Sequence, residues 1–181
     1  MNRLRLTCLL LTLAILTGCS ISPYRNGYPS EDSWAVLPVR SLDSSEKGIQ
    51  IERMLKVQLA AKGIKQVSLP PDTEVPGSNN LLVNAHRLKN AETWAKQHNV
   101  KLAMTGSIDN FTTDENGRFQ IGVTLNLMDI NTGKNVWVMS GESSGESSGD
   151  SGDDFFKVTR KLLNTLLKNL PLTGTTMKKV G

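Results

Sequence analysis

Residues 1–18 carry a pattern that removes them from any folded domain. Arg3 and Arg5 give this segment a positive start, and residues 6–16 form an almost uncharged apolar run. A permanent transmembrane helix needs about twenty apolar residues to cross a bilayer, so this run is too short to span one. A basic start followed by a short apolar run is typical of a secretory signal peptide. We therefore expect the mature protein to begin after residue 18 and to fold outside the cytoplasm.

The signal peptide ends in the sequence Leu16-Thr-Gly-Cys19, which resembles the lipobox of bacterial lipoproteins. In that family the cysteine is acylated and becomes the new N-terminus after cleavage. The alternative is an ordinary signal peptide followed by an incidental cysteine. Ser20 follows the cysteine, and by the sorting rule of this family a residue other than Asp there implies transfer to the outer membrane. The resemblance thus implies a covalent lipid on Cys19, with the domain at the periplasmic face of the outer membrane.

The mature chain keeps one cysteine, because Cys8 lies in the signal peptide and Cys19 is the lipidation candidate. No internal disulfide can therefore form, although the compartment is oxidising. Two of the 21 Lys and Arg residues leave with the signal, against 17 Asp and Glu residues. A balance so close to neutral argues against nucleic acid as a partner.

Residues 19–33 follow the signal, and their Pro, Gly, Ser and Asn residues predict a flexible tether. Stretched fully, such a tether covers at most about 50 Å, so the domain must stay close to its membrane. We expect one folded domain over residues 34–171 and a disordered tail over residues 172–181.

Hydrophobic periodicity within residues 34–171 predicts five strands and three helices. Strands are expected over 34–39, 66–69, 100–111, 120–130 and 136–140. Helices are expected from a capping box at Asp43 and Glu46 to Gly63, from about residue 81 to Asn99, and over 153–170. The last helix has a buried stripe of Phe155, Thr159, Leu162, Leu163, Leu166, Leu167 and Leu170. The order βαβαβββα predicts a single α/β domain with a mixed sheet of about five strands packed by three helices.

A repeat of Ser-Gly-Glu-Ser tetrapeptides, varied once to Ser-Gly-Asp-Ser, precedes the last helix over residues 140–151. Its composition is too polar for a core and predicts a solvated, flexible loop. The acidic residues of this region, with no basic residue between them, are Glu142, Glu146, Asp150, Asp153 and Asp154. Their spacing does not match an EF-hand calcium loop. A run of like charge can instead attract a cationic ligand, which is the functional alternative to the solvated loop.

The sequence offers no convergent catalytic group. His86 and His98 match no zinc-ligand spacing, and the motifs HExxH, paired CxxC, GxSxG and the P-loop are absent. A glycosidase pair of carboxylates stays possible, but nothing singles one out. We therefore predict a protein that is not an enzyme, without a metal site and with no cofactor apart from the lipid on Cys19.

Trp137 is the aromatic residue with the least obvious place in a core. On the predicted strand, Val136 and Val138 share one face, so Trp137 is expected on the other. A covering helix, a neighbouring subunit or the lipid interface could meet it there.

The assembled segments resemble the PelC family of outer-membrane lipoproteins, within a wider group that includes curli-secretion lipoproteins, TolB N-terminal domains and LpoB-like activators. The segments that carry the resemblance are Trp34–Val39, Ala95–Val100 with Met104–Ile108, Leu125–Asp129 and Thr132–Trp137, with the Ser/Gly repeat before the last helix. The resemblance implies a dodecameric ring under the outer membrane. It implies an acidic funnel that guides a cationic, partly deacetylated polysaccharide to an outer-membrane porin, in export for a biofilm matrix. It also implies an aromatic side chain at the lipid interface, for which Trp137 is the candidate.

The alternative function is a lipoprotein adaptor or activator of a cell-envelope enzyme or secretion channel. An LpoB-like activator must cross the periplasm, which the predicted tether is too short to do. A curli-type channel needs extra amphipathic strands for its own barrel, and the sequence has no spare pair.

Overall fold

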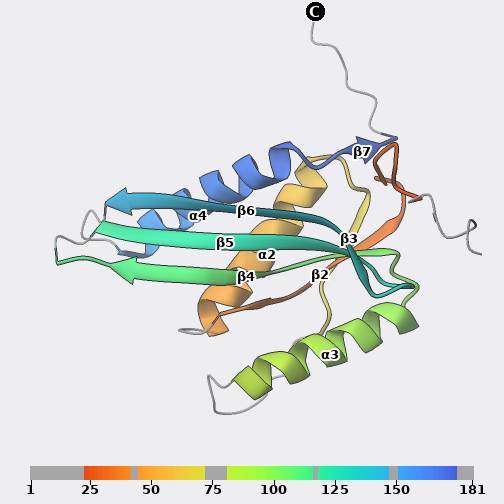
Figure 1. Cartoon of the computed structure of the whole chain (residues 1–181), viewed down its shortest axis with the longest axis horizontal. Helices are drawn as coiled ribbons and strands as arrows, with labels where there is room; N and C mark the ends of the chain where they lie inside the picture. The colour runs from red at the N-terminus through yellow and green to blue at the C-terminus, as the bar shows by residue number, and fades with distance from the viewer. Residues whose placement is uncertain (1–22, 42–44, 72–80, 116–117, 147–150, 175–181) are drawn as a thin grey trace, which may run out of the picture.

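The computed structural model describes residues 23–41, 45–71, 81–115, 118–146 and 151–174 (Figure 1). The predicted signal peptide, Cys19 and Asp150 lie outside these residues. Within the described part of the chain, no helix is long and apolar enough to cross a membrane.

A five-stranded mixed sheet forms the centre of the domain, as predicted. Its strands lie in the order β3 (Gln66–Ser68), β2 (Ser33–Arg40), β4 (Leu102–Thr113), β5 (Arg118–Asp129) and β6 (Lys134–Glu146). β2 runs parallel to both β3 and β4, whereas β4, β5 and β6 are antiparallel to one another. Together with three helices, this arrangement confirms the predicted α/β class.

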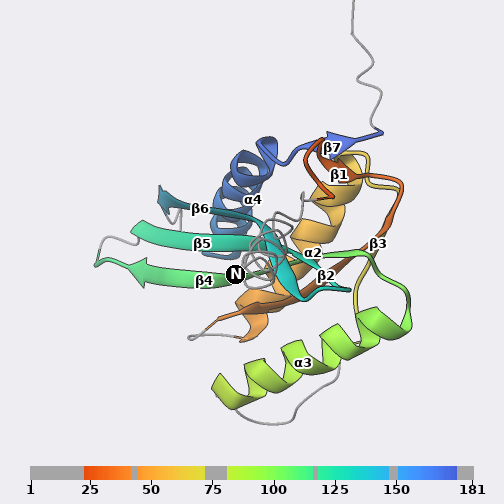
Figure 2. The ribbon, with the colours of Figure 1, turned by 45° about the vertical axis from the view of Figure 1, so that its right-hand side comes forward.

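Helices α2 (Ser45–Ala61) and α4 (Ser151–Lys168) cover one face of the sheet (Figure 2). Ile51, Leu55 and Leu59 of α2 are fully buried in the larger of two hydrophobic cores. The whole predicted stripe of α4 is buried as well. Because this stripe repeats at helical spacing, one side of α4 lies on the sheet and the other faces solvent.

Helix α3 (Leu81–Gln97) lies on the opposite face, where it covers mainly β2 (Figure 1). Ala91 and Ala95 are buried there with Ala35 and Leu37 of β2 in the smaller core. The helix ends where Asn99 adopts a left-handed conformation with φ of 54°. Since α3 packs mainly against β2, no described helix covers this side of the sheet along most of β5 and β6.

The folded domain extends beyond the predicted boundaries at both ends. β1 (Tyr28–Pro29) pairs in parallel with β7 (Leu172–Thr173), and only 5% of the Tyr28 surface is exposed. The expected boundaries at residues 33 and 171 therefore differ from those of the structure. Composition is misleading here, because the two tyrosines among the Pro, Gly and Ser residues supply apolar surface and hydroxyl groups that fix the backbone.

The first half of the Ser/Gly repeat is a strand, so the predicted loop is wrong there. β6 continues to Glu146, with Gly141 and Gly145 facing α4. A Cβ atom added at Gly141 would lie 2.9 Å from the Leu166 side chain, and one at Gly145 would lie 2.5 Å from the Val158 side chain. The glycines thus let the helix approach the strand. Along this part of β6, small residues that face α4 alternate with polar residues that face solvent, which is the period of two of a strand.

Candidate functional site

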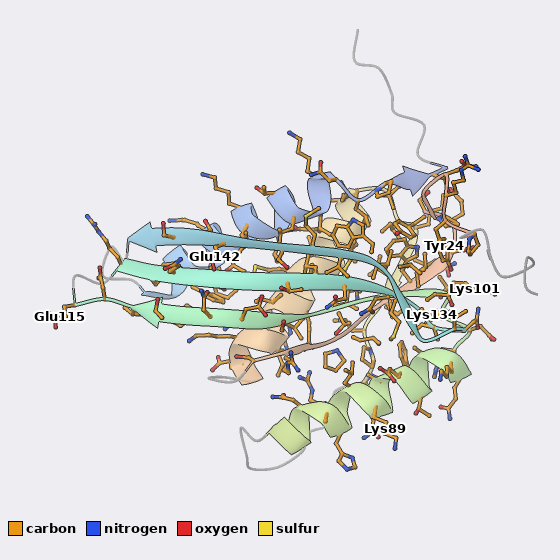
Figure 3. The ribbon with its side chains drawn as sticks, viewed as in Figure 1. Tyr24, Lys89, Lys101, Glu115, Lys134 and Glu142 are labelled. Atoms are coloured by element: carbon orange, nitrogen blue, oxygen red, sulfur yellow. The ribbon has the colours of Figure 1, made fainter. Side chains whose placement is uncertain are left out.

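The outer side of β4, β5 and β6 carries a hydrogen-bonded polar surface, which we call the open face (Figure 3). Its members are Ser107, Asp109, Asn110, Gln120, Thr124, Ser140 and Glu142. The three strands are antiparallel, so side chains from distant parts of the sequence meet across them.

Glu142 on β6 accepts hydrogen bonds from side chains of β4 and β5. Its Oε1 atom accepts a hydrogen bond from Asn110 Nδ2 at 3.2 Å, and its Oε2 atom accepts one from Gln120 Nε2 at 3.0 Å. Gly122 lies between them on β5, where an added Cβ would come within 2.5 Å of Asn110 Oδ1. The glycine therefore lets the Asn110 side chain reach across β5. The Glu142 carboxylate is oriented by these bonds and still exposed to solvent.

Asp109 is a second carboxylate on the open face. The β4–β5 register shifts between Ile108 and Asn110, which places Asp109 at a bulge. Its Oδ1 atom accepts a hydrogen bond from Ser107 Oγ at 2.6 Å, and its Oδ2 atom accepts one from Thr124 Oγ1 at 2.6 Å. Thr124 Oγ1 also lies 2.8 Å from Ser140 Oγ on β6. The sequence does not single out Asp109, because the bulge that exposes it leaves no mark in the hydrophobic pattern.

The structure divides the predicted acidic run. Glu142 belongs to the open face, and Glu146 ends β6 opposite Arg118 in the strand register. Asp153 and Asp154 lie in the first turn of α4, with side chains outside the described set, as is all of Asp150. Among the described side chains, Glu142 therefore shares the open face with Asp109, and Asp109 does not belong to the predicted acidic run.

Trp137 is half-buried and packs against the larger core. The β5–β6 register shifts between Leu127 and Met128, and this bulge turns Val136 toward the same core. Val138 is 53% exposed, so the expectation that it shares a face with Val136 was wrong. Trp137 therefore lies on the side of the sheet that the helices α2 and α4 cover, which is the first of its three predicted surroundings. Its role at a membrane or subunit interface stays a prediction.

Two tyrosines fix the start of the described chain to the β5–β6 hairpin. Tyr24 donates a hydrogen bond to Asp129 Oδ2, and Tyr28 donates one to the Val136 carbonyl oxygen at 2.6 Å. Asp129 also accepts a hydrogen bond from the Thr132 backbone N–H at 2.9 Å. We call Tyr24, Tyr28, Asp129 and Val136 the tyrosine clamp.

The clamp alters the ionisation of its members. Burial raises the pKa of Tyr24 well above its ordinary value, and the hydrogen bond to Asp129 raises it further. Burial alone would raise the pKa of Asp129, but the hydrogen bonds from Tyr24 and Thr132 outweigh it and lower that pKa. The pair is therefore held as a neutral phenol and an ionised carboxylate.

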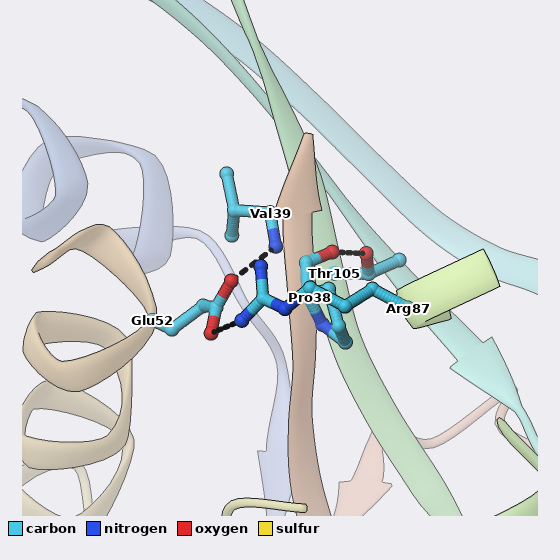
Figure 4. A network of polar contacts seen from close by, with 5 residues as sticks. All are labelled: Pro38, Val39, Glu52, Arg87 and Thr105. Carbon is cyan, nitrogen blue, oxygen red and sulfur yellow. Dashed lines mark hydrogen bonds and ion pairs between the residues drawn. The ribbon is translucent and has the colours of Figure 1, made fainter. Parts of the chain in front are cut away.

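A buried ion pair between Glu52 and Arg87 lies beside the C-terminal end of β2 (Figure 4). Glu52 Oε1 accepts a hydrogen bond from the Val39 backbone N–H at 2.8 Å, while Glu52 Oε2 lies 3.0 Å from Arg87 Nη2. Thr105 Oγ1 donates to the Pro38 carbonyl oxygen at 2.8 Å, beside the β2–β4 register shift. Glu52 thus replaces a missing strand partner and joins α2, β2 and α3. Its charge is used within the protein.

Within the described residues, no group of three or more His, Cys, Asp or Glu side chains is placed to hold a metal ion. His98 stacks on the Trp94 ring at 4.6 Å between centroids, and one of its ring nitrogens lies 2.8 Å from the Trp94 carbonyl oxygen. His98 therefore packs directly after the end of α3 at Gln97.

Two solved structures of PelC share this fold, although no family model and no curated protein matches the sequence. A PelC dodecamer from Paraburkholderia phytofirmans is 22% identical, with a TM-score of 0.62 over 81% of this chain and 91% of that chain. A variant of that PelC with one leucine replaced by methionine gives a TM-score of 0.61 over 81% of this chain and 93% of that one, also at 22% identity. Lipoprotein GNA1162 from Neisseria meningitidis is 16% identical, with a TM-score of 0.44 over 67% and 91% of the two chains. The predicted similarity to PelC is confirmed at the level of the fold.

Proposed function

We propose that this chain is a non-catalytic lipoprotein of the outer membrane that assembles into a periplasmic ring and guides a cationic exopolysaccharide of the Pel type to an outer-membrane porin. The observation that carries the proposal is the fold match to PelC, a dodecamer, over 81% of this chain. Cys19 would hold the lipid, and the ring would serve export for a biofilm matrix.

The open face supports the electrostatic part of this proposal. A partly deacetylated polysaccharide carries ammonium groups, and Asp109 and Glu142 present carboxylates on one side of the sheet. One exposed ion pair contributes about 0–1 kcal/mol, so a single subunit would hold the polymer weakly. Repetition around a ring would add these weak contacts together and strengthen the local field. Weak contacts also suit a guide, because the polymer must leave each one.

The remaining acidic residues and Trp137 have proposed places in the same assembly. Glu146, Asp150, Asp153 and Asp154 would extend the negative charge beyond Glu142. Trp137 is half-buried against the larger core, and we propose that the exposed part of its ring lies at a subunit or lipid interface.

The native mass of the lipidated mature protein in a lipid nanodisc tests the ring, with electron-microscopic particle images beside it. We expect a closed ring of many subunits. A strict monomer would refute the ring and favour the adaptor function, for which a pull-down of a protein partner is the next step.

The anchor has a separate test in the variant Cys19→Ala. We expect this variant to move from the membrane fraction to the soluble periplasmic fraction and to lose export, while its melting temperature stays unchanged. Full export by an unanchored protein would show that the lipid is dispensable.

A further inference from the structure

We propose that the end of the domain beside Tyr24 docks onto an anionic phospholipid bilayer, and that Lys96, Lys101 and Lys134 contact the lipid headgroups. We call these three lysines the basic collar. This inference rests on the proposed lipid on Cys19. It adds an orientation of the domain on the membrane, which a flexible tether would not provide.

The tyrosine clamp shortens the tether to a few residues. Tyr24 donates a hydrogen bond to Asp129 at the β5–β6 hairpin, so the chain is fixed to the domain from this residue onward. The chain from Cys19 to Tyr24 can span at most about 18 Å. β5 and β6 are each about 40 Å long at the usual rise of a strand. Tyr24 must therefore stay within about 18 Å of the membrane, a distance shorter than the strands are long.

The basic collar lies at the same end of the sheet as Tyr24. Lys134 is the first residue of β6 and lies opposite Asp129 in the strand register. The Lys101 carbonyl oxygen accepts a hydrogen bond from the Ile130 N–H at 3.0 Å, and Lys96 and Lys101 line one surface pocket with Asn131. Figure 3 shows Lys101 and Lys134 at the Tyr24 end of the sheet, and Glu115 at the opposite end.

The charge of the collar is available to a ligand. All three lysines are exposed, and no ion pair between described residues includes any of them. Arg25, next to Tyr24, is exposed as well.

The acidic residues of this end are largely used within the protein. Asp129 is buried against Tyr24, and Glu31 pairs with Lys65, which leaves Asp32 near the tyrosine. Glu92 lies one helical turn before Lys96 on α3. Among the described residues, the three lysines and Arg25 therefore outnumber the remaining carboxylates Asp32 and Glu92 at this end.

A bilayer fits this surface better than a small anion does. The collar lysines lie on three different segments, namely α3, the loop before β4 and the start of β6. All three are exposed, and among the described residues no buried polar group lines the pocket of Lys96 and Lys101 to enclose one phosphate. A membrane surface presents many headgroups and needs no enclosed site. Each lysine near such a surface strengthens binding roughly five-fold, so three together contribute about a hundred-fold.

The test uses residues 20–181, which keep every described residue and carry no lipid. Sedimentation is measured with phosphatidylcholine vesicles that contain about 30% phosphatidylglycerol, and with phosphatidylcholine alone, at about 20 mM salt. We expect binding only to the anionic vesicles. The triple variant Lys96→Gln, Lys101→Gln, Lys134→Gln should bind about a hundred-fold more weakly, with an unchanged circular dichroism spectrum.

A matched control removes the same charge from another exposed basic surface. Lys157, Arg160 and Lys161 lie on the solvent side of α4, whose first half packs near Gly145, far along β6 from Lys134. Their triple replacement by Gln should leave vesicle binding within about three-fold of the wild type.

Four results would overturn the inference. They are absence of wild-type binding, equal binding to neutral vesicles, an equal loss in both triple variants, and release by inorganic phosphate at constant ionic strength. The native mass is measured separately. A ring whose collar is inert would refute only this inference, and a monomer whose collar binds membranes would refute only the ring.

Discussion

The tyrosine clamp and the open face are both polar, but they hold their polar groups in opposite ways. In the clamp, Asp129 is 7% exposed, and its oxygens accept hydrogen bonds from a tyrosine and from backbone. On the open face, Glu142 is exposed and is held by two neutral side chains. Buried polar groups must be paired, because an unpaired one loses its hydration without compensation. The clamp is therefore part of the fold, whereas the open face leaves its carboxylates exposed to solvent.

The greatest loss of stability is expected when the clamp residue Tyr28 is replaced by Ala. The side chain is buried, and its ring meets the Trp34 ring edge-on at 6.5 Å between centroids. Its removal should lower the free energy of unfolding by about 3–5 kcal/mol, measured by urea denaturation. Tyr28→Phe, which loses only the bond to Val136, should cost about 1 kcal/mol. Equal stability of the wild type and Tyr28→Ala would mean that the clamp is not part of the domain.

A smaller loss of stability is expected on the inner side of β6, from Gly145→Val. The added side chain would meet Val158 and Phe119, so the helix or the strand must shift, at a cost of about 1–3 kcal/mol. Ser144→Val, one residue away on the exposed side, is the matched control and should change stability by less than about 0.5 kcal/mol. Similar values for the two variants would indicate that the repeat behaves as a loop in solution, as its composition predicts.

The ionisation of the clamp gives a pH prediction. Because the pKa of Asp129 is lowered in the folded state, its contribution is present above its unfolded pKa of about 4 and is lost as the pH falls through the folded value. The raised pKa of Tyr24 acts at the other limit: its contribution is present below about pH 10 and is lost as the pH rises further.

Urea denaturation across this pH range would measure how the free energy of unfolding falls toward low pH, the acid limb, and toward high pH, the alkaline limb. Asp129→Asn should flatten the acid limb, and Tyr24→Phe should flatten the alkaline limb. An unchanged acid limb in Asp129→Asn would mean that the clamp is open in solution.

The two regions also differ in how far the sequence predicts them. The core was predictable, since the stripes of α2 and α4 repeat at helical spacing and β5 alternates at a period of two. The clamp was missed because a tyrosine among Pro, Gly and Ser residues resembles a tether until its hydroxyl partner is known. Tyr28 and Val136 are 108 positions apart in the sequence. The network around Glu142 depends on a bulge in β4 and a glycine in β5, and the chain alone does not show that they lie side by side.

The smallest change in stability, with a clear change in binding, is expected on the open face from Asp109→Asn with Glu142→Gln. Both replacements keep side chains of the same shape, so unfolding should shift by less than about 1 kcal/mol. Binding to a partly deacetylated glucosamine polymer should weaken several-fold per subunit at low salt, and the difference should fade as salt screens the charges.

The control for that experiment is Asp114→Asn with Glu115→Gln, which removes the same charge at the end of β4. Because those two carboxylates lie beyond the Glu142 network, this variant should bind the polymer more tightly than the open-face variant does. If both variants bind equally well, the polymer responds to total charge, and the ordered carboxylates of the open face have no special part in guiding it. If only the open-face variant weakens, the hydrogen bonds from Asn110 and Gln120 position a charge that the polymer uses.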